Sequence, residues 1–367
     1  MTGAVGVIGA DAPRQIILAA GALPLRLFGS WSPQAGALPA GTGEEALELL
    51  GAVDAPAATL LAQLLGGEHD HLAGVILCND SAATLRLFYV LRMLSARGRL
   101  SIPVHLLDAP ASGESAPGTA AARQRFVAAQ YARLVGFLES VTGVRADRRR
   151  LQEAAEQEEA LGRALQQMRA RRRQGSCSGT AAAAAYRAAA RQPVEQALAV
   201  IEAAGADQAG ADGTLPGVRT YLTGSEDPEG SIISLLEERG ALVIGEDHDG
   251  GDSSWLGEAA YGAEVEEIVW ALAGRHADRA PRAARASSRS RAQHLGRELH
   301  AASVEQVLSL VRLYDEAPLW DAAAQQEQAA QQGVAWAMVS GIRPGQERTA
   351  AEQALAEARG IREASHV

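Results

Sequence analysis

Short apolar segments recur along this 367-residue chain with helix-length stretches between them, and this alternation constrains the fold more than any other feature. Apolar runs of about 5 to 8 residues that alternate with helical segments are typical of βαβ units and of a mostly parallel sheet. Three runs lie early in the chain and four lie late. They cover residues 23–28, 73–78, 102–107, 220–223, 241–245, 306–314 and 335–340.

The middle of the chain carries no strand pattern. Residues 119–211 are rich in Ala, Glu, Gln, Arg and Leu, and Leu151, Leu161, Leu165 and Met168 lie mostly at helical spacing on one face. We therefore predict an α/β fold of two Rossmann-like domains, doubly wound and mostly parallel, joined by a helical connector. The predicted parts are an N-terminal α/β domain (1–118), the connector (119–211) and a C-terminal α/β domain (212–367).

Local signals in the C-terminal part support a crossover unit. Asp227 and Pro228 precede an apolar helical segment that Gly240 ends, and residues 241–245 form the next strand. Ligands of such sheets bind beyond the carboxyl ends of the strands. The loops of interest are thus residues 78–81, 224–227 and 246–252.

Charge and composition exclude several classes of function. All 34 basic residues are arginine, which excludes a P-loop, Schiff-base chemistry and a kinase strand lysine. The net charge of −10 disfavours binding to nucleic acid or to an anionic membrane, since both depend on clustered positive charge. The start of the chain lacks the features of a signal peptide, and no apolar run approaches the roughly 20 residues that span a bilayer. We therefore expect a cytoplasmic protein.

The two cysteines, Cys78 and Cys177, are too few for a disulfide framework or for a four-thiolate metal site within one chain. Cys78 ends a predicted strand, where it could be a thiolate nucleophile, a metal ligand or a small buried apolar residue. Cys177 lies in a Gly-x-Cys-x-Gly pattern typical of a nucleophile elbow. A charged helix, not a strand, precedes that pattern, which favours a thiol in a loop.

Other polar groups allow two interpretations each. Glu246, Asp247, His248 and Asp249 follow a predicted strand and could bind a divalent cation or supply a general base, or they could form a solvated loop. His69 and His71 precede a strand, which favours a surface position. The arginines at 275, 279, 282, 285, 289 and 291 could clamp a phosphorylated ligand such as a coenzyme A nucleotide, or they could belong to an exposed, mobile connection.

The order of several sequence blocks resembles that of the 2-hydroxyacyl-CoA dehydratase D-component family, which also contains benzoyl-CoA reductase subunits. The opening block at residues 13–27 has a proline, a helix, Ala-Ala-Gly21, a second proline and a strand. Further matching blocks follow in order over essentially the whole chain. They lie at residues 72–78, 102–107, 137–143, 219–224, 236–247, 307–315 and 333–334.

The resemblance implies two α/β domains and a subunit of a complex that removes water from a 2-hydroxyacyl thioester. Members of the family typically hold a [4Fe-4S] cluster through three cysteines, receive an electron from an ATP-dependent activator and form a ketyl radical anion. Carried over to this chain, one ligand position matches Cys78, one falls at residues 55–58, where Ala-Pro-Ala-Ala stands, and one falls at Tyr314, before Asp315. Two of the three cysteines are therefore missing.

Three hypotheses follow from the resemblance and its departures. The first is a divergent subunit that forms a heterodimer with a cluster-bearing paralogue, with acyl-CoA as substrate and an ATP-dependent activator as a further partner. The second is a non-catalytic scaffold or acyl-CoA-binding protein. The third is an iron–sulfur dehydratase subunit whose atypical cluster ligands include Cys78.

Overall fold

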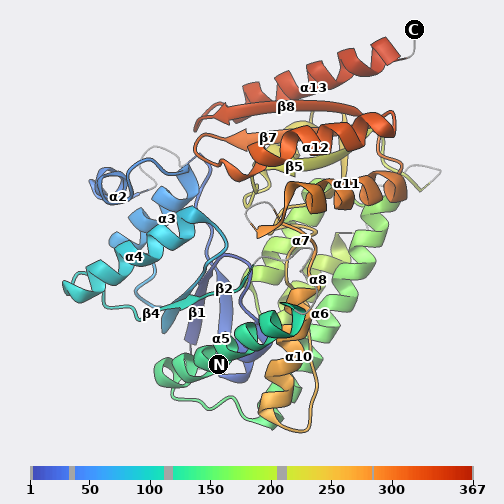
Figure 1. The fold of residues 1–367 in the computed structure, drawn as a ribbon. Helices are drawn as coiled ribbons and strands as arrows, with labels where there is room; N and C mark the ends of the chain where they lie inside the picture. The colour runs from blue at the N-terminus through green and yellow to red at the C-terminus, as the bar shows by residue number, and fades with distance from the viewer. Residues whose placement is uncertain (1–2, 33–37, 111–118, 205–212, 283–284, 366–367) are drawn as a thin grey trace. The chain divides into compact units, whose positions relative to one another are not determined.

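The computed structural model describes residues 3–32, 38–110, 119–204, 213–282 and 285–365, and it divides into two compact units. The first unit comprises residues 1–163, 189–196 and 255–279. The second comprises residues 164–188, 197–254 and 280–367. Each unit contains a four-stranded sheet whose strand pairs are all parallel, so the predicted α/β class with two doubly wound sheets is confirmed (Figure 1). The predicted domain boundaries at 118 and at 211–212 fall outside the described residues.

The sheet of the first unit has the strand order β2-β1-β3-β4. The strands are β1 (Gly3–Ile8), β2 (Ala22–Arg26), β3 (Gly74–Cys78) and β4 (Val104–Leu107). β2 lies on one side of β1, whereas β3 and β4 lie on the other side. The strand order therefore reverses between β1 and β3. Ligand sites of doubly wound folds lie at such a switch point.

Helices cover both faces of the first sheet. Val5, Ile76 and Cys78 share one apolar cluster with α1 (Arg14–Ala19), α5 (Thr119–Thr142) and α10 (Val265–Ala277). Val75 and Leu77 share another with α2 (Thr42–Leu50), α3 (Ala55–Leu65) and α4 (Ala82–Ala96). Because successive strand residues point to opposite faces, these continuous apolar strands supply both layers.

β1 is the one central strand of this sheet that the sequence analysis did not predict. Its small residues give a weak apolar signal, yet it pairs with both β2 and β3. A Cβ atom at Gly6 would lie 2.9 Å from Cδ1 of Leu27 and of Leu72. A side chain at this position would displace the Leu27 and Leu72 side chains, so the packing favours glycine here.

The second sheet has the order β6-β5-β7-β8. Its strands are β5 (Val218–Gly224), β6 (Ala241–Glu246), β7 (Gln306–Arg312) and β8 (Ala335–Ile342), and the switch point lies between β5 and β7. Leu242, Val307 and Trp336 pack with α11 (Ser288–Ala302) and α12 (Ala317–Gln331). The helices α9 (Ser231–Glu237) and α13 (Glu347–Ser365) also contact these strands, and α13 packs on β7 and β8.

The predicted helical middle segment is confirmed as α5, α6 (Arg148–Gln174), α7 (Gly179–Arg191) and α8 (Val194–Ala203). Leu151, Leu161, Leu165 and Met168 of α6 are fully buried. No helix among the described residues is long and apolar enough to cross a membrane.

Candidate functional sites at the strand ends

Cys78 is the last residue of β3 and lies fully buried at the switch point of the first sheet. The loop after β1 covers it, since a Cβ atom at Gly9 would lie 2.7 Å from the Cys78 Cβ and 2.2 Å from Oδ2 of Asp80. The Ala10 N–H donates a hydrogen bond to the same Asp80 oxygen at 3.0 Å. Burial raises the pKa of the Cys78 thiol well above its usual range, and the carboxylates of Asp80 and Asp11 raise it further.

Asp11 belongs to a second buried contact in this unit. Its Oδ1 accepts a hydrogen bond from Arg279 Nη1 at 2.7 Å and lies 2.8 Å from His276 Nε2. Trp255 packs edge-on against the His276 ring, with centroids 5.3 Å apart. A carboxylate held in this way is a fixed negative charge near the Cys78 thiol.

These surroundings do not fit a [4Fe-4S] cluster. A [4Fe-4S] cluster is held by several thiolates, whereas the charged side chains near the Cys78 thiol include the carboxylates of Asp80 and Asp11, which would repel a thiolate. The Gly9 backbone also packs closely against Cys78. The described residues contain no group of three or more His, Cys, Asp or Glu side chains that could hold a metal ion. The role of Cys78 as a ligand stays a prediction, and its surroundings give it no support.

The other two ligand positions implied by the resemblance carry no thiol. Residues 55–58 form the first turn of α3. Tyr314 follows β7 at the switch point of the second sheet, with 55% of its surface exposed and a positive φ of 70°. Cys78 and Tyr314 thus follow the topologically equivalent strand in each sheet, but Tyr314 presents a phenol there.

Cys177 lies in the turn between α6 and α7 and is buried. A helix precedes it, so the strand that a nucleophile elbow requires is absent from this described segment. Its Sγ donates weakly to the Ser178 carbonyl oxygen at 3.5 Å, and burial raises its pKa. Cys177 is therefore a structural thiol in this fold.

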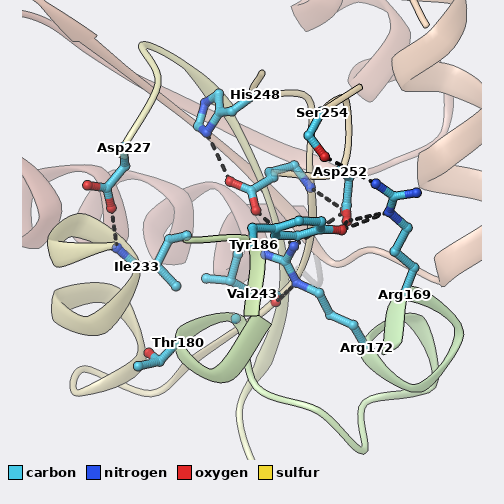
Figure 2. A network of polar contacts seen from close by, with 12 residues as sticks. Arg169, Arg172, Thr180, Tyr186, Asp227, Ile233, Val243, His248, Asp252 and Ser254 are labelled. Atoms are coloured by element: carbon cyan, nitrogen blue, oxygen red, sulfur yellow. Dashed lines mark hydrogen bonds and ion pairs between the residues drawn. The ribbon is translucent and has the colours of Figure 1, made fainter. Parts of the chain in front are cut away.

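A network of buried charges lies at the end of β6 in the second unit (Figure 2). Arg172 Nη1 donates to Glu246 Oε1 at 2.9 Å, and Arg172 Nε donates to the Val243 carbonyl oxygen at 2.9 Å. The other Glu246 oxygen lies 3.0 Å from His248 Nδ1. Burial opposes ionisation of Glu246, but Arg172 and His248 together lower its pKa to about 2.

The contact with Glu246 shifts the pKa of His248 in the opposite direction, upwards. Burial alone would lower the pKa of His248, but the hydrogen bond to Glu246 and the nearby Asp247 and Glu226 carboxylates raise it. The imidazole is therefore biased towards its protonated form. A protonated, buried histidine is a poor general base.

A second part of this network joins α6, α7 and the loop after β6. Tyr186 donates to Asp252 Oδ1, and Arg169 Nε donates to the Tyr186 hydroxyl at 2.8 Å (Figure 2). Asp252 Oδ2 accepts from the Glu246 N–H at 3.2 Å and from Arg172 at 3.4 Å. Burial is the main cause of the raised pKa of Tyr186. The phenol therefore stays protonated and acts as a hydrogen-bond donor.

The remaining acids of the 246–249 cluster are paired with other arginines. Arg291 donates to Asp247 and to Asp321, and Thr223 Oγ1 also donates to Asp247 at 3.0 Å. Asp249 accepts from Arg282 at 3.1 Å. Glu246, Asp247 and Asp249 thus pair with three different arginines, so the described cluster is a structural charge network and leaves no convergent set of oxygens for a divalent cation.

The arginines of residues 275–291 do not lie in a single exposed loop. Arg279, Arg282 and Arg291 are buried side chains that pair with acids, and α11 already begins at Ser288. Only Arg275 among these four is largely exposed, where it pairs with Glu258. The prediction of an exposed, mobile connection is wrong for the three buried arginines, because acids distant in sequence neutralise them. Residues 283–284 lie outside the described part.

His69 and His71 lie just before β3, as the sequence indicated. Their ring centroids are 6.4 Å apart, His69 is half-buried and His71 is exposed. Burial lowers the pKa of His69, and the neighbouring His71 and Arg191 lower it further. The described surroundings of the pair provide no metal site.

Sequence reasoning did not predict the central cation, Arg172. A signal was present, because Leu161, Leu165, Met168 and Arg172 follow one another at helical spacing. All four are fully buried, so Arg172 continues the apolar face of α6. Arg172 stands between Arg171 and Arg173, and three successive arginines are typical of a solvated helix end. That run of arginines by itself therefore predicts an exposed side chain at Arg172.

Two parallel, doubly wound sheets with polar loops at their carboxyl ends define a two-unit α/β protein of Rossmann-like architecture. A model of the 2-hydroxyglutaryl-CoA dehydratase D-component family matches residues 10–312. The chain belongs to this family. A comparison with individual curated proteins finds no match.

Proposed function

We propose that this chain is a divergent subunit of a 2-hydroxyacyl-CoA dehydratase-like complex that supplies fold and interface beside a cluster-bearing paralogue. Family membership supports the dehydratase context. The proposal rests on the residues that occupy the positions of the family's three cluster-binding cysteines. Cys78 is fully buried against Gly9, the second ligand position carries the phenol of Tyr314, and Cys177 is the only other cysteine of the sequence.

An exposed apolar segment supports the role of an interface. Tyr314, Leu319 and Trp320 all lie between the end of β7 and the first turn of α12, and Trp320 has 78% of its surface exposed. Exposed tryptophan and tyrosine side chains in one patch are typical of protein–protein contact sites. The segment begins at the switch point of its sheet. A partner bound here would therefore lie beside Tyr314, where the resemblance places a cluster ligand.

The experiment is anaerobic co-expression of this chain with a family paralogue that has all three cysteines, followed by iron and sulfide analysis of each purified chain and of the complex. We expect a stable heteromer whose iron belongs to the paralogue and is unchanged by Cys78→Ser. A stoichiometric four-iron cluster on this chain alone would contradict the proposal. Iron and broad visible absorbance that are lost in Cys78→Ser would instead indicate atypical ligation.

A variant of the exposed segment tests the interface separately. Trp320→Ala should weaken the heteromer, whereas Trp270→Ala, another exposed tryptophan on α10, should not. Binding of acyl-CoA esters without turnover in every subunit combination would favour the scaffold hypothesis. Unchanged association in Trp320→Ala, or an equal loss in Trp270→Ala, would contradict a specific contact at Trp320.

A further inference from the structure

A pocket lies within the first unit beside the carboxyl ends of β1 and β2. It has an empty volume of about 330 Å³, part of it open to solvent. Arg14, Arg26 and Trp255 provide its large polar side chains, and none of the described residues that line it is acidic. The rest of the described lining is Val7, Gly9, Ala10, Ala12, Pro24, Ala190 and Leu256.

Two hydrogen-bond donors in this lining are buried without a partner. Arg14 Nε donates to Glu158 Oε1 at 3.0 Å and Arg14 Nη1 donates to the Pro24 carbonyl oxygen at 3.4 Å, but no acceptor among the described residues reaches Arg14 Nη2. The Nε1–H of Trp255 also lacks an acceptor there. Both side chains are more than nine-tenths buried. Buried donors are nearly always satisfied in native proteins, by protein, water or ligand.

Three backbone carbonyl oxygens of the lining already accept hydrogen bonds. The Val7 carbonyl oxygen accepts from the Leu27 N–H at 2.8 Å, and the Ala10 carbonyl oxygen accepts from Arg279 at 2.9 Å. The Pro24 carbonyl accepts from Arg14 itself. Arg14 Nη2 and the Trp255 indole N–H therefore remain without an acceptor, whereas these three acceptors are occupied. A ligand with several acceptor oxygens and no need to donate suits it better than a water molecule does.

The apolar part of the lining indicates the chemical character of the rest of the ligand. Val7, Ala12, Pro24 and Leu256 present apolar side chains, and because the empty volume includes space open to solvent, the enclosed part admits only a small molecule. A short apolar chain would be buried favourably against them, whereas a fully hydrated phosphate would lose solvation without a matching surface.

We propose that this pocket binds a small carboxylate with a short apolar chain, its oxygens accepting hydrogen bonds from Arg14 and Trp255. The Arg14 guanidinium, which is already paired with Glu158 through Nε, supplies one donor through Nη2, and the indole N–H supplies a second. This inference does not depend on the cluster or on a partner subunit. It can therefore fail or succeed independently of the proposed function.

The test uses the full chain alone, with butyrate, its uncharged analogue butyramide and inorganic phosphate as probes. Binding is measured by isothermal titration calorimetry and by the shift in Tm. We expect butyrate to bind and to raise Tm, and butyramide and phosphate to bind much more weakly. Trp255→Phe removes the donor but keeps an aromatic ring, and it should weaken butyrate binding roughly tenfold.

Two further variants make the outcome decisive. Trp336→Phe changes a buried tryptophan of the second unit and should leave butyrate affinity unchanged. The double variant Arg14→Gln with Glu158→Gln removes both members of the buried pair and should abolish binding without leaving an unpaired charge. Equal binding of butyrate and butyramide, tighter binding of phosphate, no binding of any probe, or unchanged affinity in Trp255→Phe and the double variant would each overturn the proposal.

Discussion

Arg172 of α6 and Glu246 at the end of β6 form an ion pair of 2.9 Å in which both side chains are almost completely removed from solvent. Arg172 also pairs with Asp252, so one cation neutralises two carboxylates. Buried charges are tolerated only when they are compensated in this way. Within the second unit, the pair therefore ties the C-terminal part of α6 to the sheet.

Arg172→Met should lower the free energy of unfolding at pH 7 by about 3–5 kcal/mol, because it leaves Glu246 and Asp252 without their shared cation. The low pKa of Glu246 stabilises the native protein above the pKa of the unfolded chain, and that contribution is lost as the pH falls towards 2. The variant should thus lose less stability at pH 4 than at pH 7. Urea unfolding at both values measures this.

The control for this variant is Arg149→Met, which breaks an exposed i,i+4 pair with Glu153. Its effect should stay below about 0.5 kcal/mol. Similar losses in the two variants would show that burial of the Arg172 pair has no special role.

Asp227 should make stability depend on pH in the opposite direction. Burial raises the pKa of Asp227 to about 6, despite the hydrogen bonds that it accepts from the Ile232 and Ile233 N–H groups. A raised native pKa means that the protonated form contributes stability below about pH 4, and this is lost as the pH rises through 6. His248 and Glu246 are the nearby titratable groups.

Asp227→Asn should therefore be more stable than the parent at pH 8, by about 2–3 kcal/mol, and should show no gain at pH 4. Denaturant unfolding of both proteins across this range provides the measurement, with the exposed Asp70→Asn as a control. An equal difference between parent and variant at every pH would rule out ionisation of Asp227 as the cause.

Gly224 ends β5 with φ of 106°, and a Cβ atom there would lie 2.4 Å from the Leu310 carbonyl oxygen. Gly224→Ala should destabilise the protein by at least about 2 kcal/mol, because neither the backbone conformation nor the neighbouring strand can accommodate the methyl group. Gly360, in α13, has no atom within 4 Å of such a Cβ. Gly360→Ala should stabilise the protein by about 0.5–1 kcal/mol. Thermal unfolding of the two variants compares these effects directly.

Both thiols should be inert in the native protein. Cys78 and Cys177 are buried, and burial raises the pKa of each. Reaction with a disulfide reagent at pH 8 should be slow without urea and should follow the unfolding transition. The Cys177→Ser variant isolates Cys78, and rapid labelling of that variant under native conditions would contradict the sealed position described above.

The parallel α/β class and the helical middle segment could be predicted from the sequence because they depend on local apolar periodicity. Seven of the eight strands carried that signal. β1 did not, because close packing at the sheet centre selects Gly6 and other small residues there. Its place between β2 and β3 depends on pairing with segments that are distant in sequence.

The cysteine count and the family-like blocks could also be recognised in the sequence. Together they indicate that the chain lacks two of the three cysteines that hold the cluster in the family. The partners of the charged groups could not be recognised in this way. Arg172 and Arg291 look like solvated charges along the chain, yet each lies buried against carboxylates more than 20 residues away. Burial and charge pairing are properties of three-dimensional packing, so only the tertiary structure decided which polar residues are structural and which donors remain available to a ligand.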